Sequence, residues 1–158
     1  MTLPVLTFPA PSLHERSLEV SPEELTQKKL QSFIDDLIAT MIAQNGVGIA
    51  APQVGNNIRV IVVQTAGGPE VYVNPQITAR SFSHARGEEG CLSVPGVFGL
   101  VERNAHVNVV ALDRHGNKVT ANTDGFASII FQHEIDHLDG ILFIDRAKKL
   151  LKNGTSKI

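Results

Sequence analysis

The strongest constraint on this chain lies in residues 132–137, which read Gln-His-Glu-Ile-Asp-His and contain an H-E-x-x-H motif. If this segment is helical, His133 and His137 lie one turn apart on the same face, where two imidazoles can hold one metal ion. Glu134, beside the first histidine, is then placed to take a proton from a water molecule that the metal activates. The motif therefore predicts a metal-dependent hydrolase built around a helix.

The residues before the motif favour a helix whose histidines face inward. Phe126, Ile129, Ile130, His133 and His137 fall at i, i+3, i+4, i+7 and i+11, so both histidines continue an apolar stripe. Two buried imidazoles without partners would cost free energy, and a shared metal ion satisfies both. The alternative interpretation is a helix whose histidines are solvated or ordinary core groups.

The third metal ligand distinguishes the classes of H-E-x-x-H hydrolase. The chain has no Glu after Glu134, so a thermolysin-like arrangement lacks its ligand, and Phe143 stands where a metzincin places its third histidine. Among the remaining donors, which include four other histidines and the carboxylates, Cys91 is preferred because a thiolate suits a borderline or soft metal. The alternative for this lone cysteine is an inert buried position.

Three motifs together resemble those of the peptide deformylase family. Residues 46–53 are similar to its G-x-G-x-A-A-x-Q motif, residues 89–93 match E-G-C-L-S, and residues 132–137 match Q-H-E-x-D-H. The resemblance extends from the N-terminus to about Asp145. It implies hydrolysis of the N-formyl group from the N-terminal formyl-methionine of newly made polypeptides, with release of formate. An H-E-x-x-H metallohydrolase or peptidase that acts on another small amide is the alternative.

The resemblance also implies roles for individual residues. One divalent metal ion is held by Cys91, His133 and His137; Fe²⁺ is expected first, with Zn²⁺, Ni²⁺ or Co²⁺ as alternatives in purified protein. Glu134 acts as general base and then as general acid. The Gln53 amide and the backbone N–H of Leu92 stabilise the oxyanion.

Further assignments concern substrate binding. The family pairs the strand that contains Val47 and Gly48 with the backbone of the substrate, and we assign Gly90 to the same site. Apolar residues on the histidine helix line the methionine pocket of the family, and here these are Phe126, Ile129 and Ile130. Plain core packing is the alternative for these three.

Three charged residues and one aromatic residue also match or depart from the pattern of the family. Glu89 and Arg103 match a pair that braces the cysteine loop, while Asp136 has no assigned partner. Phe98 stands where some relatives place an arginine that reaches the bound peptide, so peptide recognition beyond the first residue is expected to differ.

Length and composition exclude several other classes of protein. At 158 residues, with 42% hydrophobic and 19% charged residues, the chain is expected to form a single catalytic domain spanning residues 1–158. A net charge of −2 gives no nucleic-acid signal, and no apolar run approaches the length of a membrane span. We therefore predict a cytoplasmic enzyme, or an organellar one if a transit peptide was removed. The resemblance to the family implies that its partners are N-formylmethionyl peptides and, transiently, the ribosome.

Local patterns predict the elements of an α+β fold. A helix is expected to begin at Ser21-Pro22 and to end near Asn45-Gly46, with Gly46 in the left-handed conformation. Strands are expected at residues 58–64, 71–73 and 107–111, followed by a hairpin turn at 113–117. These strands should form mixed, mainly antiparallel sheets packed around a central metal-binding helix that carries the HExxH motif.

The boundaries of that helix can also be predicted from the sequence. Thr123 or Asp124 should cap its start, and Leu138 or Asp139 should end it before Gly140. The polar tail, residues 148–158, is expected to form a final helical turn or to fray.

Overall fold

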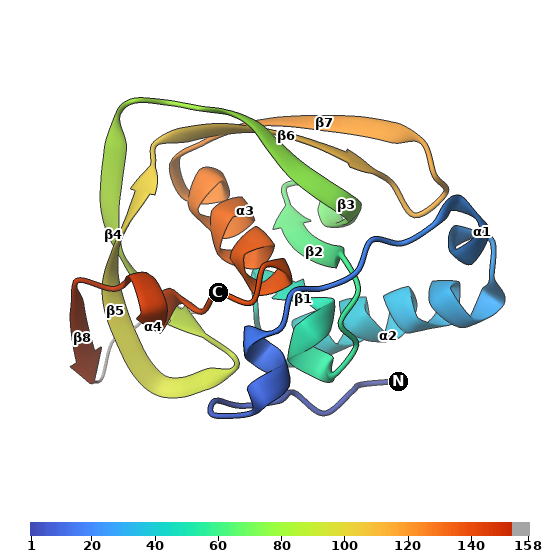
Figure 1. Cartoon of the computed structure of the whole chain (residues 1–158), viewed down its shortest axis with the longest axis horizontal. Helices are drawn as coiled ribbons and strands as arrows, with labels where there is room; N and C mark the ends of the chain where they lie inside the picture. The colour runs from blue at the N-terminus through green and yellow to red at the C-terminus, as the bar shows by residue number, and fades with distance from the viewer. Residues whose placement is uncertain (153–158) are drawn as a thin grey trace.

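The computed structural model describes residues 1–152 and shows an α+β arrangement of helices and antiparallel strands (Figure 1). The N-terminal part holds η1 (Pro11–His14), α1 (Pro22–Leu25) and α2 (Lys28–Ala43). The middle consists of β1 (Gly48–Ala50), the 3₁₀ helix η2 (Ala51–Val54), β2 (Val60–Thr65), β3 (Gly68–Arg80), β4 (His84–Cys91), β5 (Val94–Asn104), β6 (His106–Leu112) and β7 (Lys118–Asp124). The chain continues with α3 (Gly125–Leu138), α4 (Phe143–Arg146) and β8 (Lys149–Lys152).

The strands form two sheets. One has five strands in the order β1-β2-β3-β6-β7, the other has the order β4-β5-β8, and neighbouring strands are antiparallel throughout. A parallel bridge between Leu18 and Ile58 lies outside the named strands. The predicted α+β class with mainly antiparallel sheets is therefore confirmed, although the named strands contain no parallel pair.

The five-stranded sheet lies between α2 and α3. Alternate residues of β2 point to opposite faces of the sheet, so this strand packs against both helices. Ile61 and Val63 pack with apolar residues of α3 in one core cluster, and Val60 and Val62 pack with apolar residues of α2 in another. Figure 1 shows α3 beneath the arch of β3, β6 and β7, with α2 beyond β1 and β2. The uninterrupted apolar run in β2 follows from this burial on both faces.

A third cluster surrounds the end of β4. Leu13 of η1, Cys91, Val101 of β5 and Phe143 of α4 pack together, so segments from both ends of the chain enclose the cysteine. Within the described residues, no helix is both long and apolar enough to cross a membrane.

The helix predicted from Ser21 onward is interrupted. Ser21 and Glu24 form the expected capping box, but α1 ends after one turn, where Thr26 Oγ1 donates to the carbonyl of Glu23 at 2.7 Å. Gln27 is extended, and α2 then begins at Lys28. A hydroxyl that bonds locally to the backbone competes with helix continuation, which explains the break.

Two further expectations were wrong in detail. Asn45, with φ of 54°, takes the left-handed conformation after α2 in place of Gly46. Residues 149–152 form strand β8, paired with β5, where a helical turn or a frayed tail was expected; residues 153–158 lie outside the described part.

The boundaries of α3 agree with the prediction. Asp124 occupies the N-cap position without a side-chain cap bond, and the neighbouring Thr123 hydroxyl donates to the Val107 carbonyl. Asp139 follows the last helical residue, and Gly140 turns the chain with φ of 75°. A Cβ atom at Gly140 would lie 2.6 Å from the carbonyl oxygen of His14, so close packing also requires glycine there.

Candidate metal centre

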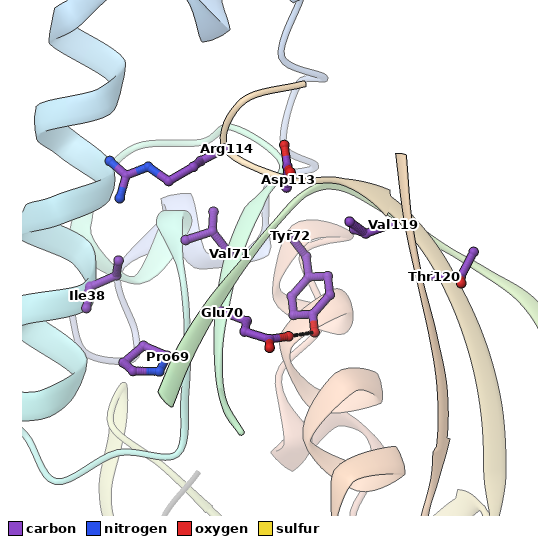
Figure 2. A pocket seen from close by; sticks show the side chains of 9 residues that line it. All are labelled: Ile38, Pro69, Glu70, Val71, Tyr72, Asp113, Arg114, Val119 and Thr120. Carbon is purple, nitrogen blue, oxygen red and sulfur yellow. Dashed lines mark hydrogen bonds between the residues drawn. The ribbon is translucent and has the colours of Figure 1, made fainter. Parts of the chain in front are cut away.

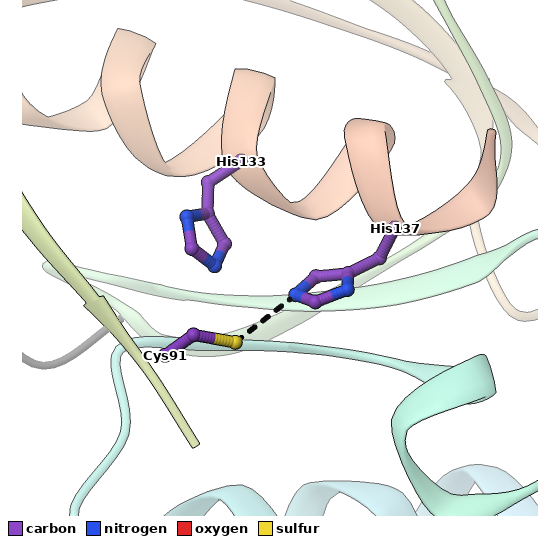
Figure 3. A group of neighbouring side chains, drawn as sticks. All are labelled: Cys91, His133 and His137. Carbon is purple, nitrogen blue, oxygen red and sulfur yellow. Dashed lines mark hydrogen bonds between the residues drawn. The ribbon is translucent and has the colours of Figure 1, made fainter. Parts of the chain in front are cut away.

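Cys91, His133 and His137 meet in the interior of the protein. One ligand atom from each lies within 4.8 Å of the others, and all three residues are buried. Figure 3 shows the two histidines extending from successive turns of α3 toward the cysteine at the end of β4. Cys91 Sγ lies 3.3 Å from His137 Nε2. The predicted trio is therefore brought together by segments that are 42 and 46 residues apart in sequence.

The orientation of His133 is set by a carboxylate behind it. His133 Nδ1 lies 2.8 Å from Glu89 Oε1, and the Nε2 atom has no hydrogen-bond partner among the described residues. Because the carboxylate accepts the Nδ1 proton, the Nε2 lone pair faces the cysteine and the second histidine. Metal-binding histidines commonly have such an outer partner.

Arg103 holds Glu89 in turn. Its Nε and Nη2 atoms donate to the two oxygens of Glu89 at 2.9 Å each, as predicted for this pair. Burial alone would raise the pKa of Glu89, but hydrogen bonds from His133 and Arg103 lower it to about 2. Glu89 is therefore a carboxylate at neutral pH and a permanent acceptor for His133.

The pKa values of Cys91 and His137 indicate whether these residues fit a bound cation. Burial raises the pKa of the Cys91 thiol to about 12, and the nearby charge of Glu134 adds to the rise. Burial and then the charge of His133 hold the pKa of His137 well below its usual value, so its imidazole is neutral. A divalent cation would stabilise the thiolate and engage the unpartnered His133 Nε2. The residues therefore fit a metal ion of the kind bound by sulfur and nitrogen.

Glu134 is fully buried beside the trio. Neither of its carboxylate oxygens has a hydrogen-bond partner among the described residues. Burial, followed by the charge of Glu89, raises its pKa well above the usual value. An unpaired buried carboxyl with a raised pKa is the kind of group that can exchange protons near neutral pH.

Gly48 makes room for that carboxyl. A Cβ atom on Gly48 would lie 2.6 Å from Glu134 Oε1, closer than such atoms approach. The sequence interpretation assigned this glycine to the approach of the substrate, and the structure adds that a side chain at this position would collide with Glu134. Val47, next to it, is partly buried against the cluster that includes α3.

Gln53 points into the centre from η2. Its Oε1 atom accepts the backbone N–H of Ala50 at 2.9 Å, and its Nε2 atom donates to Cys91 Sγ at 3.5 Å and Ser93 Oγ at 3.2 Å. The backbone bond fixes the amide so that its N–H groups face the sulfur. Sequence reasoning missed Ser93, although its place two residues after Cys91 in the same motif was a usable signal.

The residues predicted to bind substrate lie around this centre in different environments. Ile130 is buried and Ile129 partly buried in the cluster between α3 and the sheet. Gly90 is buried in β4 opposite Phe98 of β5. Phe126 is 53% exposed, so its predicted inward-facing position was wrong. It lies in the first turn of α3, where the apolar stripe has not yet reached the core.

Two cavities differ in their relation to the trio. One of about 230 Å³ is lined by Gln44, Cys91, Leu92 and residues 94–98 at the start of β5. Another, of about 390 Å³, lies between α2, the start of β3 and the β6–β7 turn, and none of the trio lines it (Figure 2). There the Tyr72 hydroxyl donates to Glu70 at 2.6 Å, and burial raises the pKa of Tyr72. Of these two cavities, the first adjoins the proposed metal ligands, since Cys91 lines it.

An α+β fold with two histidines on one helix, a cysteine from a separate hairpin and a buried glutamate defines a hydrolase of the H-E-x-x-H class. The model of the family described as polypeptide deformylase matches residues 2–153. The chain belongs to the polypeptide deformylase family.

Individual relatives agree with this assignment. Peptide deformylase 2 of Nostoc sp. is 40% identical over 165 aligned positions, covering 98% of this chain and 91% of that protein. A class I type b peptide deformylase from Acinetobacter baumannii superposes with a TM-score of 0.89 at 44% identity, covering 92% of this chain and 99% of that one. A peptide deformylase from Thermotoga maritima gives 0.89 at 36% identity, with coverage of 94% and 99%.

Proposed function

We propose that this protein is a metal-dependent hydrolase that removes the N-formyl group from the N-terminal formyl-methionine of newly made polypeptides. The observation that carries the proposal is the buried group of Cys91, His133, His137 and Glu134 in a chain that belongs to this family. A structure of the Acinetobacter baumannii enzyme with Met-Ala-Ser bound, 42% identical with a TM-score of 0.87, supports a short methionyl peptide as the product.

The metal site consists of Cys91, His133 and His137 on and beside the central helix α3. A divalent cation bound there would supply Lewis acidity that lowers the pKa of a water molecule. We propose Fe²⁺ as the ion in the cell, and one thiolate with two imidazoles also suits Zn²⁺, Co²⁺ and Ni²⁺.

Glu134 handles the protons of the reaction. Its carboxylate accepts a proton from the attacking water, whose oxygen bonds to the formyl carbon. The same proton then passes to the departing nitrogen as the C–N bond breaks, so formate and a free amine result. The lack of any hydrogen-bond partner for Glu134 among residues 1–152 leaves both oxygens free for this task.

The oxyanion that forms at the formyl group is stabilised by N–H donors. Gln53 Nε2, already directed at Cys91 Sγ, is one, and the backbone N–H of Leu92 in the β4–β5 turn is the other. Donors that are held before the reaction need no reorganisation when charge develops, which makes them effective.

The substrate backbone is proposed to lie along β1, which is an edge strand of the five-stranded sheet. Val47 and Gly48 from this edge and Gly90 from β4 would flank the peptide, as in strand addition. The methionine side chain would enter between Ile129 and Ile130, with Phe126 at the exposed rim.

Three further expectations stay predictions. These are a single catalytic domain over residues 1–158, action in the cytoplasm or in an organelle after removal of a transit peptide, and transient ribosome association.

The experiment that tests the function is formate release from formyl-Met-Ala-Ser by protein loaded anaerobically with Fe²⁺ or Ni²⁺. Glu134→Gln, which keeps the size of the side chain, is expected to bind metal normally and to lose activity by about 10²–10⁴-fold, the usual contribution of a general base. Formate release by metal-loaded wild type, with little or none from metal-loaded Glu134→Gln, supports both the proposed function and the proposed role of Glu134. Absence of formate with bound metal confirmed by elemental analysis would contradict the proposed substrate.

A further inference from the structure

The charged residues behind His133 continue beyond Glu89 and Arg103. Arg103 Nη1 donates to Asp136 Oδ2 at 2.6 Å, and Arg146 Nε donates to the same oxygen at 2.6 Å. Arg146 Nη2 donates to the other oxygen of Asp136 at 2.9 Å. An unbroken series of hydrogen bonds therefore runs from Arg146, whose side chain is 45% exposed, to the buried His133.

Arg146 belongs to α4, which touches His133 in a second way. Phe143, also on α4, stacks on the His133 ring with 6.2 Å between centroids and 20° between planes. One short helical turn thus contacts the imidazole directly through Phe143 and indirectly through Arg146. The histidine is fixed from its ring face and from its Nδ1 side.

We propose that Arg146 is a positioning residue for the metal site, and this inference rests on the proposed metal-dependent function. A two-point contact from the Arg146 guanidinium fixes the rotamer of Asp136. Asp136 in turn holds Nη1 of Arg103, so that the remaining donors of Arg103 stay on Glu89. Glu89 then keeps His133 Nε2 aimed toward Cys91 and His137.

A cavity next to this series of hydrogen bonds gives the Asp136 carboxylate room to move when Arg146 is replaced. About 240 Å³ of space, lined by polar groups that include Arg80 and His84, borders Arg103, Asp136 and Arg146. Without Arg146, the Asp136 carboxylate can rotate into this space toward Arg80 or water. Arg103 then loses its fixed anchor, and the Glu89–His133 contact becomes less well defined.

A purely structural role makes a different prediction. If Arg146 only ties α4 to α3, its loss lowers the stability of the metal-free protein and leaves metal affinity unchanged. A positioning role lowers affinity for the metal itself, because the ligand is less often in the binding orientation. Metal affinity therefore separates the two roles without any measurement of activity.

The experiment compares Arg146→Gln, Arg146→Lys and wild type by Zn²⁺ affinity in chelator competition and by the thiolate-to-Co²⁺ absorption band. Arg114→Gln is the matched control, since Arg114 also makes charged and amide contacts, with Asp35 at 2.8 Å and Gln31 at 2.9 Å, but lies away from the trio. Arg146→Gln is expected to weaken Zn²⁺ binding about tenfold, the lower end for outer partners of metal ligands. Arg146→Lys should fall between it and wild type, and the control should match wild type.

Each outcome decides the inference. Equal Zn²⁺ affinity and an unchanged Co²⁺ band in Arg146→Gln and wild type would overturn the positioning role while leaving the proposed function intact. No Zn²⁺ binding by wild type would remove the metal site and the inference together. If Arg146→Gln fails to fold, Arg146→Lys decides, because loss of the two-point contact alone should still weaken binding measurably.

Discussion

Gly48 and Glu134 occupy space that cannot hold one more methyl group. In Gly48→Ala the new Cβ would meet Glu134 Oε1 at 2.6 Å, so the carboxyl has to move. We expect activity to fall about 10²-fold, as for a catalytic group displaced by about 1 Å, while metal affinity stays as in wild type. Formate release and Zn²⁺ competition measure the two effects. Gly67→Ala, whose nearest neighbour is Thr65 Oγ1 at 3.8 Å, is the control, and wild-type activity in both variants would contradict the argument.

Glu89 gives the metal-free protein a predictable response to acid. Its pKa falls from 4.5 to about 2 on folding, so its ionised form stabilises the fold above pH 4.5, and this contribution is lost as pH falls toward 2. Glu89→Gln leaves Arg103 buried without its main partner and should cost about 3–5 kcal/mol of unfolding free energy at neutral pH. The difference between variant and wild type should shrink as pH falls through that window. Denaturant titrations at several pH values test this, and a difference independent of pH would refute it.

Gly140 connects α3 to the segment that leads to α4. Its φ of 75° strains any other residue, and its Cβ position lies 2.6 Å from the carbonyl oxygen of His14. Gly96 has φ of 76° with no atom near its Cβ position, so Gly96→Ala isolates the backbone strain. We expect Gly96→Ala to cost about 1–2 kcal/mol, as for an L-residue in the left-handed region, and Gly140→Ala to cost clearly more. Urea unfolding measures both, and equal costs would show that the contact with His14 is unimportant.

Some elements could be predicted from the sequence because their signals are local. The apolar period of α3 with Gly140 at its end, the capping box at Ser21 and the hairpin turn before β7 depend on neighbouring residues. Strands β4, β5 and β8 were not predicted: β4 is rich in Gly and charge, and β8 forms by pairing with β5. Pairing partners distant in sequence leave no local pattern.

The residues of the site also fall into those that have a local sequence signal and those that have none. Cys91, His133, His137 and Glu134 could be predicted from the motifs because their chemistry is unusual at that spacing. Arg146 could not, because its link to His133 passes through three other side chains from separate elements.

Removal of the metal should lower the stability of the whole protein, because the proposed ligands come from segments that pack in two different core clusters. Cys91 packs with η1 and α4, whereas the histidine helix packs on the five-stranded sheet. Zn²⁺ at 100 times its dissociation constant should add about 2.7 kcal/mol, and a chelator should lower the melting temperature accordingly. Calorimetry with and without chelator measures this, with Cys91→Ser as a variant whose response should be smaller. A melting temperature that ignores both metal and chelator would contradict the site.

The enclosure of Cys91 by η1 and α4 has a consequence for the order of events during biosynthesis. The sulfur is surrounded by residues from both ends of the chain, including Leu13 and Phe143, and α4 also supplies the ring that rests on His133. A ribosome exposes residue 143 after residues 13 and 91, so the nascent chain carries its cysteine before the part of the surrounding cluster that α4 supplies has been made. We therefore expect tight metal binding only after residue 143 has emerged from the ribosome.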